Sequence, residues 1–156
     1  MYQRVPRVMD AAKFKTLSEE LETVAGLLPA KTKIAEWSGK SAVLCGADGT
    51  GSPKFTKDII MFNGDATDGM DHETFAIERD NIKRTIEYGE DKNELVFDFC
   101  KTARKPYDLM VKISMLRLKH HFPQTEISGD GGASDWKQAR TIYKKAFGEN
   151  GPRLNR

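Results

Sequence analysis

The segment between Lys105 and Pro123 constrains the fold of this chain more than any other. Pro106 suits the first position of a helix, because its fixed φ is helical and its missing N–H would be unpaired there. At about 100° per residue, the segment carries two apolar stripes on opposite sides and only a narrow polar strip. The first stripe holds Leu109, Ile113 and Leu116, and the second holds Tyr107, Val111, Met115, Leu118 and Phe122. Such a helix is either buried between two layers or covers a partner, and we expect burial within the fold.

Hydrophobic periodicity predicts two further helices. Within residues 10–28, apolar side chains recur every three or four positions, and either Asp10 or Thr16 is expected to cap the start. Ser134 is expected to cap a last helix, whose apolar stripe lies within residues 136–147. The chain therefore has three predicted helices, one near each end and one following its middle.

Short segments between the first two helices, and one after the second, have the composition of β-strands. They lie at residues 41–45, 57–62, 72–77, 82–88, 94–100 and 124–128, and turn-forming residues bound them. In the fifth segment, Leu95, Phe97 and Phe99 fall on alternate positions, which predicts one strongly apolar face. The strand–helix–strand order over residues 94–128 is also compatible with a parallel pair.

These patterns together predict a single α+β domain over residues 1–148, followed by a flexible C-terminal tail over residues 149–156. We expect a mostly antiparallel or mixed sheet of five to six strands, in a single layer covered by three helices. A chain of 156 residues that is 38% hydrophobic can build one compact core. A cytoplasmic location without a membrane span is expected, because no apolar run reaches about 18 residues and the two cysteines suit a reducing compartment.

Charge is distributed unevenly along the chain. Residues 51–100 hold six Lys and Arg against twelve Asp and Glu, whereas residues 101–156 hold twelve against five. The formal net charge of +2 therefore combines an acidic middle with a basic end. Either the two parts lie side by side and partly neutralise each other, or the basic end forms a face that meets an anionic partner.

The most unusual segment lies between the strand at residues 94–100 and the apolar helix. It holds three cations, Lys101, Arg104 and Lys105, together with other polar side chains. Loops at the carboxyl ends of strands favour ligands, and an arginine offers a two-pronged donor for phosphate or carboxylate. The segment therefore predicts an anion site, although it lacks the glycine spacing of a P-loop. The alternative is that its cations are solvated or pair with the acidic middle of the chain. The expected contact residues are Lys101, Thr102, Arg104, Lys105, Tyr107 and His120.

The last helix offers a second candidate surface. Lys137, Arg140, Lys144 and Lys145 lie opposite its apolar stripe and could contact phosphates. As a plain solvated helix face, however, they need no partner, and we favour that interpretation.

No metal site and no cofactor are predicted. His120 and His121 are adjacent on a helix and point about 100° apart, so they do not share one metal easily. The loop from Asp65 to Glu73 is rich in carboxylates, but its spacing does not match an EF-hand. We expect a solvated loop there, and a cation or a basic neighbour would help it to order.

Residues 97–108, with the apolar helix, His120-His121-Phe122 and Ser128-Gly129-Asp130-Gly131, resemble small uncharacterised proteins encoded by phages and prophages. Phe62-Asn63-Gly64 and His72-Glu73-Thr74-Phe75 add to a resemblance that covers about residues 60–147. The resemblance implies a cytoplasmic accessory protein of a mobile element, which acts by binding host components. It implies no enzymatic activity and supplies no catalytic residues.

The function expected from the sequence is therefore that of a non-enzymatic binding protein. Its basic strand-to-helix turn would engage an anionic ligand, a nucleic acid, or a host or phage protein. One alternative is a small enzyme acting on a phosphorylated or nucleotide substrate, in which Lys101 and Arg104 clamp the anion and His120 or Asp108 serves as acid or base. Another is a homodimeric structural protein that uses the Met-rich helix over residues 106–121 as its interface.

Overall fold

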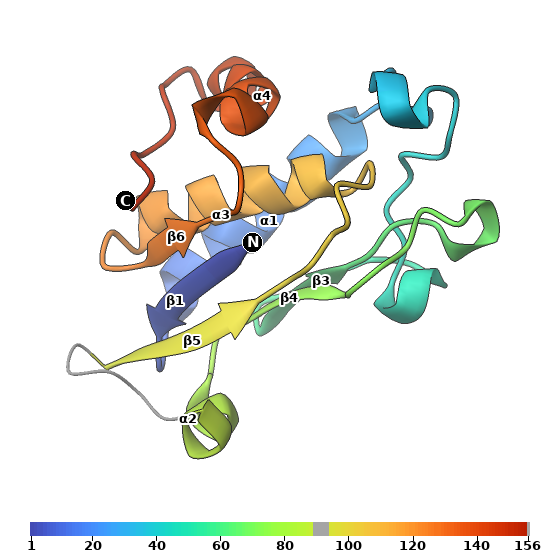
Figure 1. The fold of residues 1–156 in the computed structure, drawn as a ribbon. Helices are drawn as coiled ribbons and strands as arrows, with labels where there is room; N and C mark the ends of the chain where they lie inside the picture. The colour runs from blue at the N-terminus through green and yellow to red at the C-terminus, as the bar shows by residue number, and fades with distance from the viewer. Residues whose placement is uncertain (89–93, 156) are drawn as a thin grey trace.

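The structure is a computed structural model that describes residues 1–88 and 94–155. Its described residues form four α-helices and two three-stranded antiparallel sheets (Figure 1). The strands are β1 (Tyr2–Pro6), β2 (Lys54–Phe55), β3 (Ile59–Phe62), β4 (Phe75–Glu78), β5 (Leu95–Phe99) and β6 (Glu126–Ser128). The helices are α1 (Ala11–Leu27), α2 (Ile82–Tyr88), α3 (Asp108–His121) and α4 (Lys137–Phe147). The α+β class is confirmed. The prediction of one sheet and three helices is wrong, because the described residues form two sheets and four α-helices.

The first sheet has the order β5-β1-β6, and its central strand is one that the sequence pattern does not reveal. In β1, Gln3 and Val5 are buried and alternate with the less buried Tyr2 and Arg4, and Pro6 at the end of the strand is buried too. Gln3 is only 4% exposed, and its amide donates to the Asp98 carboxylate. Because a glutamine occupies a core position, the apolar alternation that identifies a strand is missing from the first residues.

The strand–helix–strand unit over residues 94–128 does not form a parallel pair. β5 and β6 both run antiparallel to β1, which lies between them, so they are parallel to each other without being hydrogen-bonded. α3 connects them across one face of the sheet (Figure 1). All strand pairs in the described residues are antiparallel, and the mixed sheet expected as an option is not formed.

The second sheet has the order β2-β3-β4 and confirms the strands expected at residues 57–62 and 72–77. The strand expected at residues 41–45 is wrong. That segment makes only isolated bridges, one of which joins Cys45 to Asn63. A Cβ at Gly46 would lie 2.7 Å from the backbone oxygens of Thr50 and Ser52, so the chain turns tightly there. Pairing with the segment at Asn63 therefore stops after Cys45.

The segment at residues 82–88 is helix α2, not the strand that its β-branched content predicted. The Asp80 carboxylate accepts from the Ile82 N–H, and the Thr85 hydroxyl donates to the Asn81 carbonyl, so polar side chains support the first turn. Ile82 and Ile86 are four positions apart, which is helical spacing, and both are exposed. The turn expected at residues 89–93 lies outside the described residues.

Helix α3 is buried on both of its apolar stripes, as the sequence predicted. Val111, Met115 and Leu116 are each at most 1% exposed, because the helix packs between α1, α4 and the first sheet. The interface of the homodimer alternative is therefore unavailable, since the Met-rich helix is covered within one chain. The helix itself begins at Asp108, after a turn that includes Pro106.

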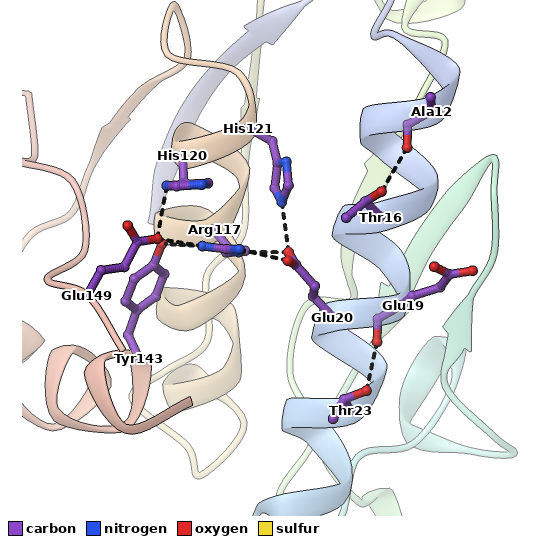
Figure 2. Close-up of polar contacts among 10 residues, drawn as sticks. All are labelled: Ala12, Thr16, Glu19, Glu20, Thr23, Arg117, His120, His121, Tyr143 and Glu149. Atoms are coloured by element: carbon purple, nitrogen blue, oxygen red, sulfur yellow. Dashed lines mark hydrogen bonds and ion pairs between the residues drawn. The ribbon is translucent and has the colours of Figure 1, made fainter. Parts of the chain in front are cut away.

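The structure also settles the expected helix caps. The Asp10 carboxylate accepts from the Lys13 N–H and caps α1, whereas the Thr16 hydroxyl bonds within the helix (Figure 2). Ser134 does not cap α4, because it lies inside a short 3₁₀ turn that precedes the helix. Gly148 ends α4 in the left-handed conformation, at φ 71°, where glycine avoids the Cβ penalty.

Residues 149–155, within the segment predicted as a loose tail, make specific contacts. The Asn155 N–H donates to the Ile127 carbonyl, and the Asn155 side-chain oxygen accepts from the Ile127 N–H, so Asn155 covers the outer edge of β6. The Arg140 guanidinium donates to the carbonyls of Gly151 and Pro152. An edge strand covered in this way is protected from pairing with another chain. Residue 156 lies outside the described residues.

Candidate functional site

The turn between β5 and α3 has an unusual backbone. Ala103 and Arg104 both adopt positive φ angles, 49° and 56°, in the left-handed region that non-glycine residues seldom occupy. The Lys105 N–H donates to the Thr102 carbonyl, and the Trp37 indole N–H donates to the Arg104 carbonyl at 3.0 Å. Backbone strain of this kind costs roughly 1–3 kcal/mol per residue and persists only where the surroundings hold it.

Three of the predicted contact residues point into the protein. The Lys105 ammonium donates to the carbonyls of Gly69 and Asp71, and the Thr102 hydroxyl donates to the Asp108 carboxylate. The buried Tyr107 hydroxyl donates to the Glu73 carbonyl, and burial raises the Tyr107 pKa. These side chains hold the turn in place, so they are structural supports rather than a contact surface.

Lys101 and Arg104 behave differently, because both are exposed. The Lys101 backbone N–H donates a hydrogen bond to the Glu73 carboxylate, with an N–O distance of 2.7 Å. The Lys101 ammonium lies 5.7 Å from the centre of the Phe99 ring. Within the part of the chain that the structure describes, neither the Lys101 ammonium nor the Arg104 guanidinium forms an ion pair. Of the cations in this turn, two therefore face outward and one is matched by backbone carbonyls.

A cavity of about 270 Å³ adjoins the two outward cations. It is lined by three cations, Lys101, Arg104 and Lys112, and by three carboxylates, Asp108, Asp130 and Asp135, together with Trp136. The Lys112 ammonium is paired with the Asp108 carboxylate and is mostly buried, so it offers little charge to a ligand. The positive charge at the mouth of the cavity comes from the turn itself.

The structure does not bring His120 to this cavity. His120 lies twelve positions after Asp108 on α3, which places it roughly 18 Å along the helix axis. Its Nδ1 lies 3.2 Å from the Glu149 carboxylate. A pocket combining Lys101, Arg104 and His120, which the enzyme alternative required, is not formed.

His120 belongs instead to a charge cluster around a buried arginine, which sequence reasoning missed (Figure 2). At its centre is Arg117, only 7% exposed, which donates to Glu20 of α1, to Tyr143 of α4 and to Glu149. The only sequence signal was an arginine between the two leucines at positions 116 and 118 of a highly apolar helix. A buried arginine needs such partners, because an unpaired buried charge is costly.

The cluster shifts the proton affinities of its members. Burial alone would raise the Glu20 pKa, but the hydrogen bonds from Arg117 and His121 outweigh burial and lower that pKa. Burial would lower the Arg117 pKa, but its bonds to Glu20 and Tyr143 raise that pKa instead. The cluster thus ties α1, α3 and α4 together as an ionised network.

The second candidate surface, on α4, is only partly free. Lys137, Lys144 and Lys145 are exposed, as expected for a solvated face. Arg140 is half-buried and its guanidinium is occupied by the backbone of the C-terminal segment. The surface therefore offers three cations rather than four.

The acidic loop of residues 65–73 is ordered by donors from the chain itself. The Asp65 carboxylate accepts from Thr67, and the Asp68 carboxylate accepts from the Ser41 N–H at 2.7 Å and lies 3.5 Å from the Lys40 ammonium. Lys105 supplies the basic neighbour through the loop carbonyls. Among residues 1–88 and 94–155, no group of three or more His, Cys, Asp or Glu side chains is placed to hold a metal ion.

The apolar face predicted for β5 is divided, because Leu95 is buried whereas Phe97 and Phe99 are exposed. Phe97 and Phe99 are 37% and 41% exposed, while Val96, on the opposite face, is fully buried. Residues directly opposite in an antiparallel pair share a face, so Tyr2, which lies opposite Phe99, joins these rings on the outer surface. The period-2 pattern indicated the right strand, but the orientation of that strand depends on which face α3 covers.

Comparison of the chain with protein-family models, with curated proteins and with solved structures found no match. The resemblance to phage-encoded proteins therefore stays a prediction. None of the helices in the described residues combines the length and the hydropathy needed to cross a bilayer.

Proposed function

We propose that this protein is a non-enzymatic binding protein that takes a phosphate-bearing anion at the turn between β5 and α3. The observation that carries the proposal is the placement of Arg104. Its left-handed backbone is fixed by the indole of Trp37, and its exposed guanidinium has no acidic partner among the residues described. Left-handed strain in a non-glycine residue is typical of functional sites, where it positions a side chain.

The chemistry around Arg104 favours an anion. Lys101 is exposed at the same cavity, whereas Lys112 is paired with Asp108 and Lys105 is held by backbone carbonyls. A guanidinium can donate two parallel hydrogen bonds to a phosphate, and a lysine adds charge without fixed geometry. The two outward cations thus provide orientation from Arg104 and attraction from Lys101.

A binding role is favoured over catalysis by the surroundings of the two candidate acid–base groups. Asp108 already accepts from Thr102 and pairs with Lys112, and His120 lies at the other end of α3. A general base must reach the proton it abstracts, and neither group is placed to do so beside Arg104. The proposal includes the expected context, a cytoplasmic accessory protein of a phage or prophage that binds a host or phage component.

Titration with pyrophosphate, followed by calorimetry, tests the proposal. We expect binding that is lost in Arg104→Gln, partly kept in Arg104→Lys, and unchanged in Lys137→Gln, which removes an exposed cation from α4. The affinity should also fall as salt rises, because the contact is electrostatic. Equal binding by Arg104→Gln and the wild type, or no pyrophosphate binding at all, would refute the anion site.

A further inference from the structure

We propose that the anion at this turn is the backbone of a single-stranded nucleic acid, whose bases stack on the aromatic side chains at the outer face of β1 and β5. This inference rests on the proposed function and names its ligand class. We call Tyr2, Phe97 and Phe99 the aromatic row. The row and the cations of the turn form one continuous surface, which a free phosphate would only partly use.

The rings of the aromatic row contact one another across the two neighbouring strands β1 and β5. The rings of Tyr2 and Phe97 are stacked, with centroids 6.3 Å apart and planes 22° apart, and the Phe97 and Phe99 centroids are 6.0 Å apart. The other face of the same strands is buried beneath the helices, so the row has no structural role in the main core. Planar rings that are exposed on a sheet provide platforms on which successive bases stack, independently of sequence.

The charges beside the row match a nucleic-acid backbone. The Lys101 ammonium lies over the Phe99 ring at 5.7 Å from its centroid, which joins the row directly to the turn that carries Arg104. At the other end, Arg4 lies opposite Phe97 in the sheet register, but its charge is offset by Glu126 at 4.0 Å. Cations that border stacked aromatics are the combination by which proteins hold single strands.

The position of the acidic groups predicts the path of the strand. Glu126 of β6 lies 4.0 Å from Arg4 and borders a hollow of about 390 Å³ over β1 and β6. On that side the one cation, Arg4, is paired with Glu126, whereas the side along β5 leads to Lys101 and Arg104, whose cavity also includes Asp130 and Asp135. We therefore infer that the bases follow β5 from Phe97 to Phe99 and that the backbone reaches the turn.

The surface fits a protein partner less well. The cores of protein interfaces are depleted of lysine, and burial of this row would also cover the ammonium of Lys101. Sheet extension by a second copy is blocked at β6, where Asn155 occupies the outer edge, so it could occur only along β5, the other edge strand. A duplex offers no exposed base faces for the rings.

Fluorescence anisotropy with a labelled oligothymidylate tests the inference. We expect Phe99→Ala to weaken oligothymidylate binding about tenfold, which is the lower range for loss of one stacking partner. Phe99→Trp should retain binding and show quenching of indole fluorescence, because a larger ring still stacks. The matched control is Leu27→Ala, which removes an exposed apolar side chain from α1, and it should change nothing.

The same variants separate this inference from the anion site. Phe99→Ala should bind pyrophosphate like the wild type, whereas Arg104→Gln should weaken both ligands. Pyrophosphate binding without oligothymidylate binding would overturn the inference and keep the anion site, and failure of both ligands would overturn both. Equal affinity for a duplex of the same length would also overturn it, as would a wild-type dimer that Phe97→Ala dissociates in light scattering.

Discussion

The guanidinium of Arg117 bonds both carboxylate oxygens of Glu20, each at 2.7 Å, and thereby joins α3 to α1 across 97 positions of the chain (Figure 2). The same guanidinium lies 4.0 Å from the centre of the Phe147 ring on α4 and donates a hydrogen bond to Glu149, which follows that helix. Two-pronged pairs of this kind are geometrically specific as well as strong. The cluster therefore fixes the relative positions of three helices that hydrophobic packing alone would fix less uniquely.

Glu20→Gln should lower the free energy of unfolding by about 1.5–3 kcal/mol, the range for hydrogen bonds to charged groups. The substitution keeps the shape of the side chain and leaves the buried Arg117 with less compensation. The matched control is Glu19→Gln, because Glu19 is exposed and pairs only with Lys15 at 3.6 Å. Urea unfolding followed by circular dichroism measures both, and equal effects of the two variants would contradict the role of the cluster.

The stability of the protein should fall as the pH drops below about 6.5. Burial, and then the nearby Arg117, lower the His120 pKa from its ordinary value of 6.5, so below that pH the unfolded chain binds the extra proton first. Stability then rises with pH across this window and is lost as the pH falls through the folded pKa. The groups that face His120 are Arg117, Glu149, His121 and Glu20.

His120→Asn should flatten that part of the profile. The lowered Glu20 pKa has the same sign at more acid pH, so the decline below about pH 4.5 should persist in the variant. Thermal unfolding between pH 4 and pH 8 measures both limbs. An unchanged slope near pH 6 in His120→Asn would rule out His120 as its source.

Arg104→Gly should stabilise the protein by up to about 1 kcal/mol while it removes anion binding. Glycine relieves the left-handed strain, and part of that gain is offset by its larger backbone entropy when unfolded. Ala103→Gly is the control, because it relieves similar strain next to the same turn without removing a charge. Thermal unfolding and pyrophosphate calorimetry on both variants give the result, and a destabilised Arg104→Gly that still binds would contradict it.

Cys100 should be unreactive in the native protein. Its thiol is buried and donates to the Glu73 carbonyl, and burial raises the pKa of Cys100 to about 12. In the Cys45→Ser variant, Ellman's reagent at pH 8 should therefore detect almost no thiol until urea unfolds the chain, because the thiolate is the reactive form. Rapid reaction of the folded variant would show that Cys100 is accessible.

Local pattern determined much of the fold. The two stripes of α3 and the apolar repeat of α1 are set by spacing along one helix, so they are readable without tertiary contacts. The strands β3 to β6 are likewise indicated by local composition and bounding turns, and β5 also by alternation. β1 and α2 were missed or misassigned, because Gln3 is buried through its bond to Asp98, and Ile82 and Ile86 are β-branched residues on an exposed helix.

The candidate site shows the same division. The gathering of cations between β5 and α3 follows from their order along the chain and needs no folded structure to be seen. Which of them face outward depends on tertiary contacts, because the carbonyls of Gly69 and Asp71, distant in sequence, draw Lys105 inward while Lys101 and Arg104 stay exposed. Tertiary packing also leaves Phe97 and Phe99 facing solvent, since α3 can cover only one side of the sheet. Spacing along a chain fixes which side chains share a face, but the partners of that face come from folding.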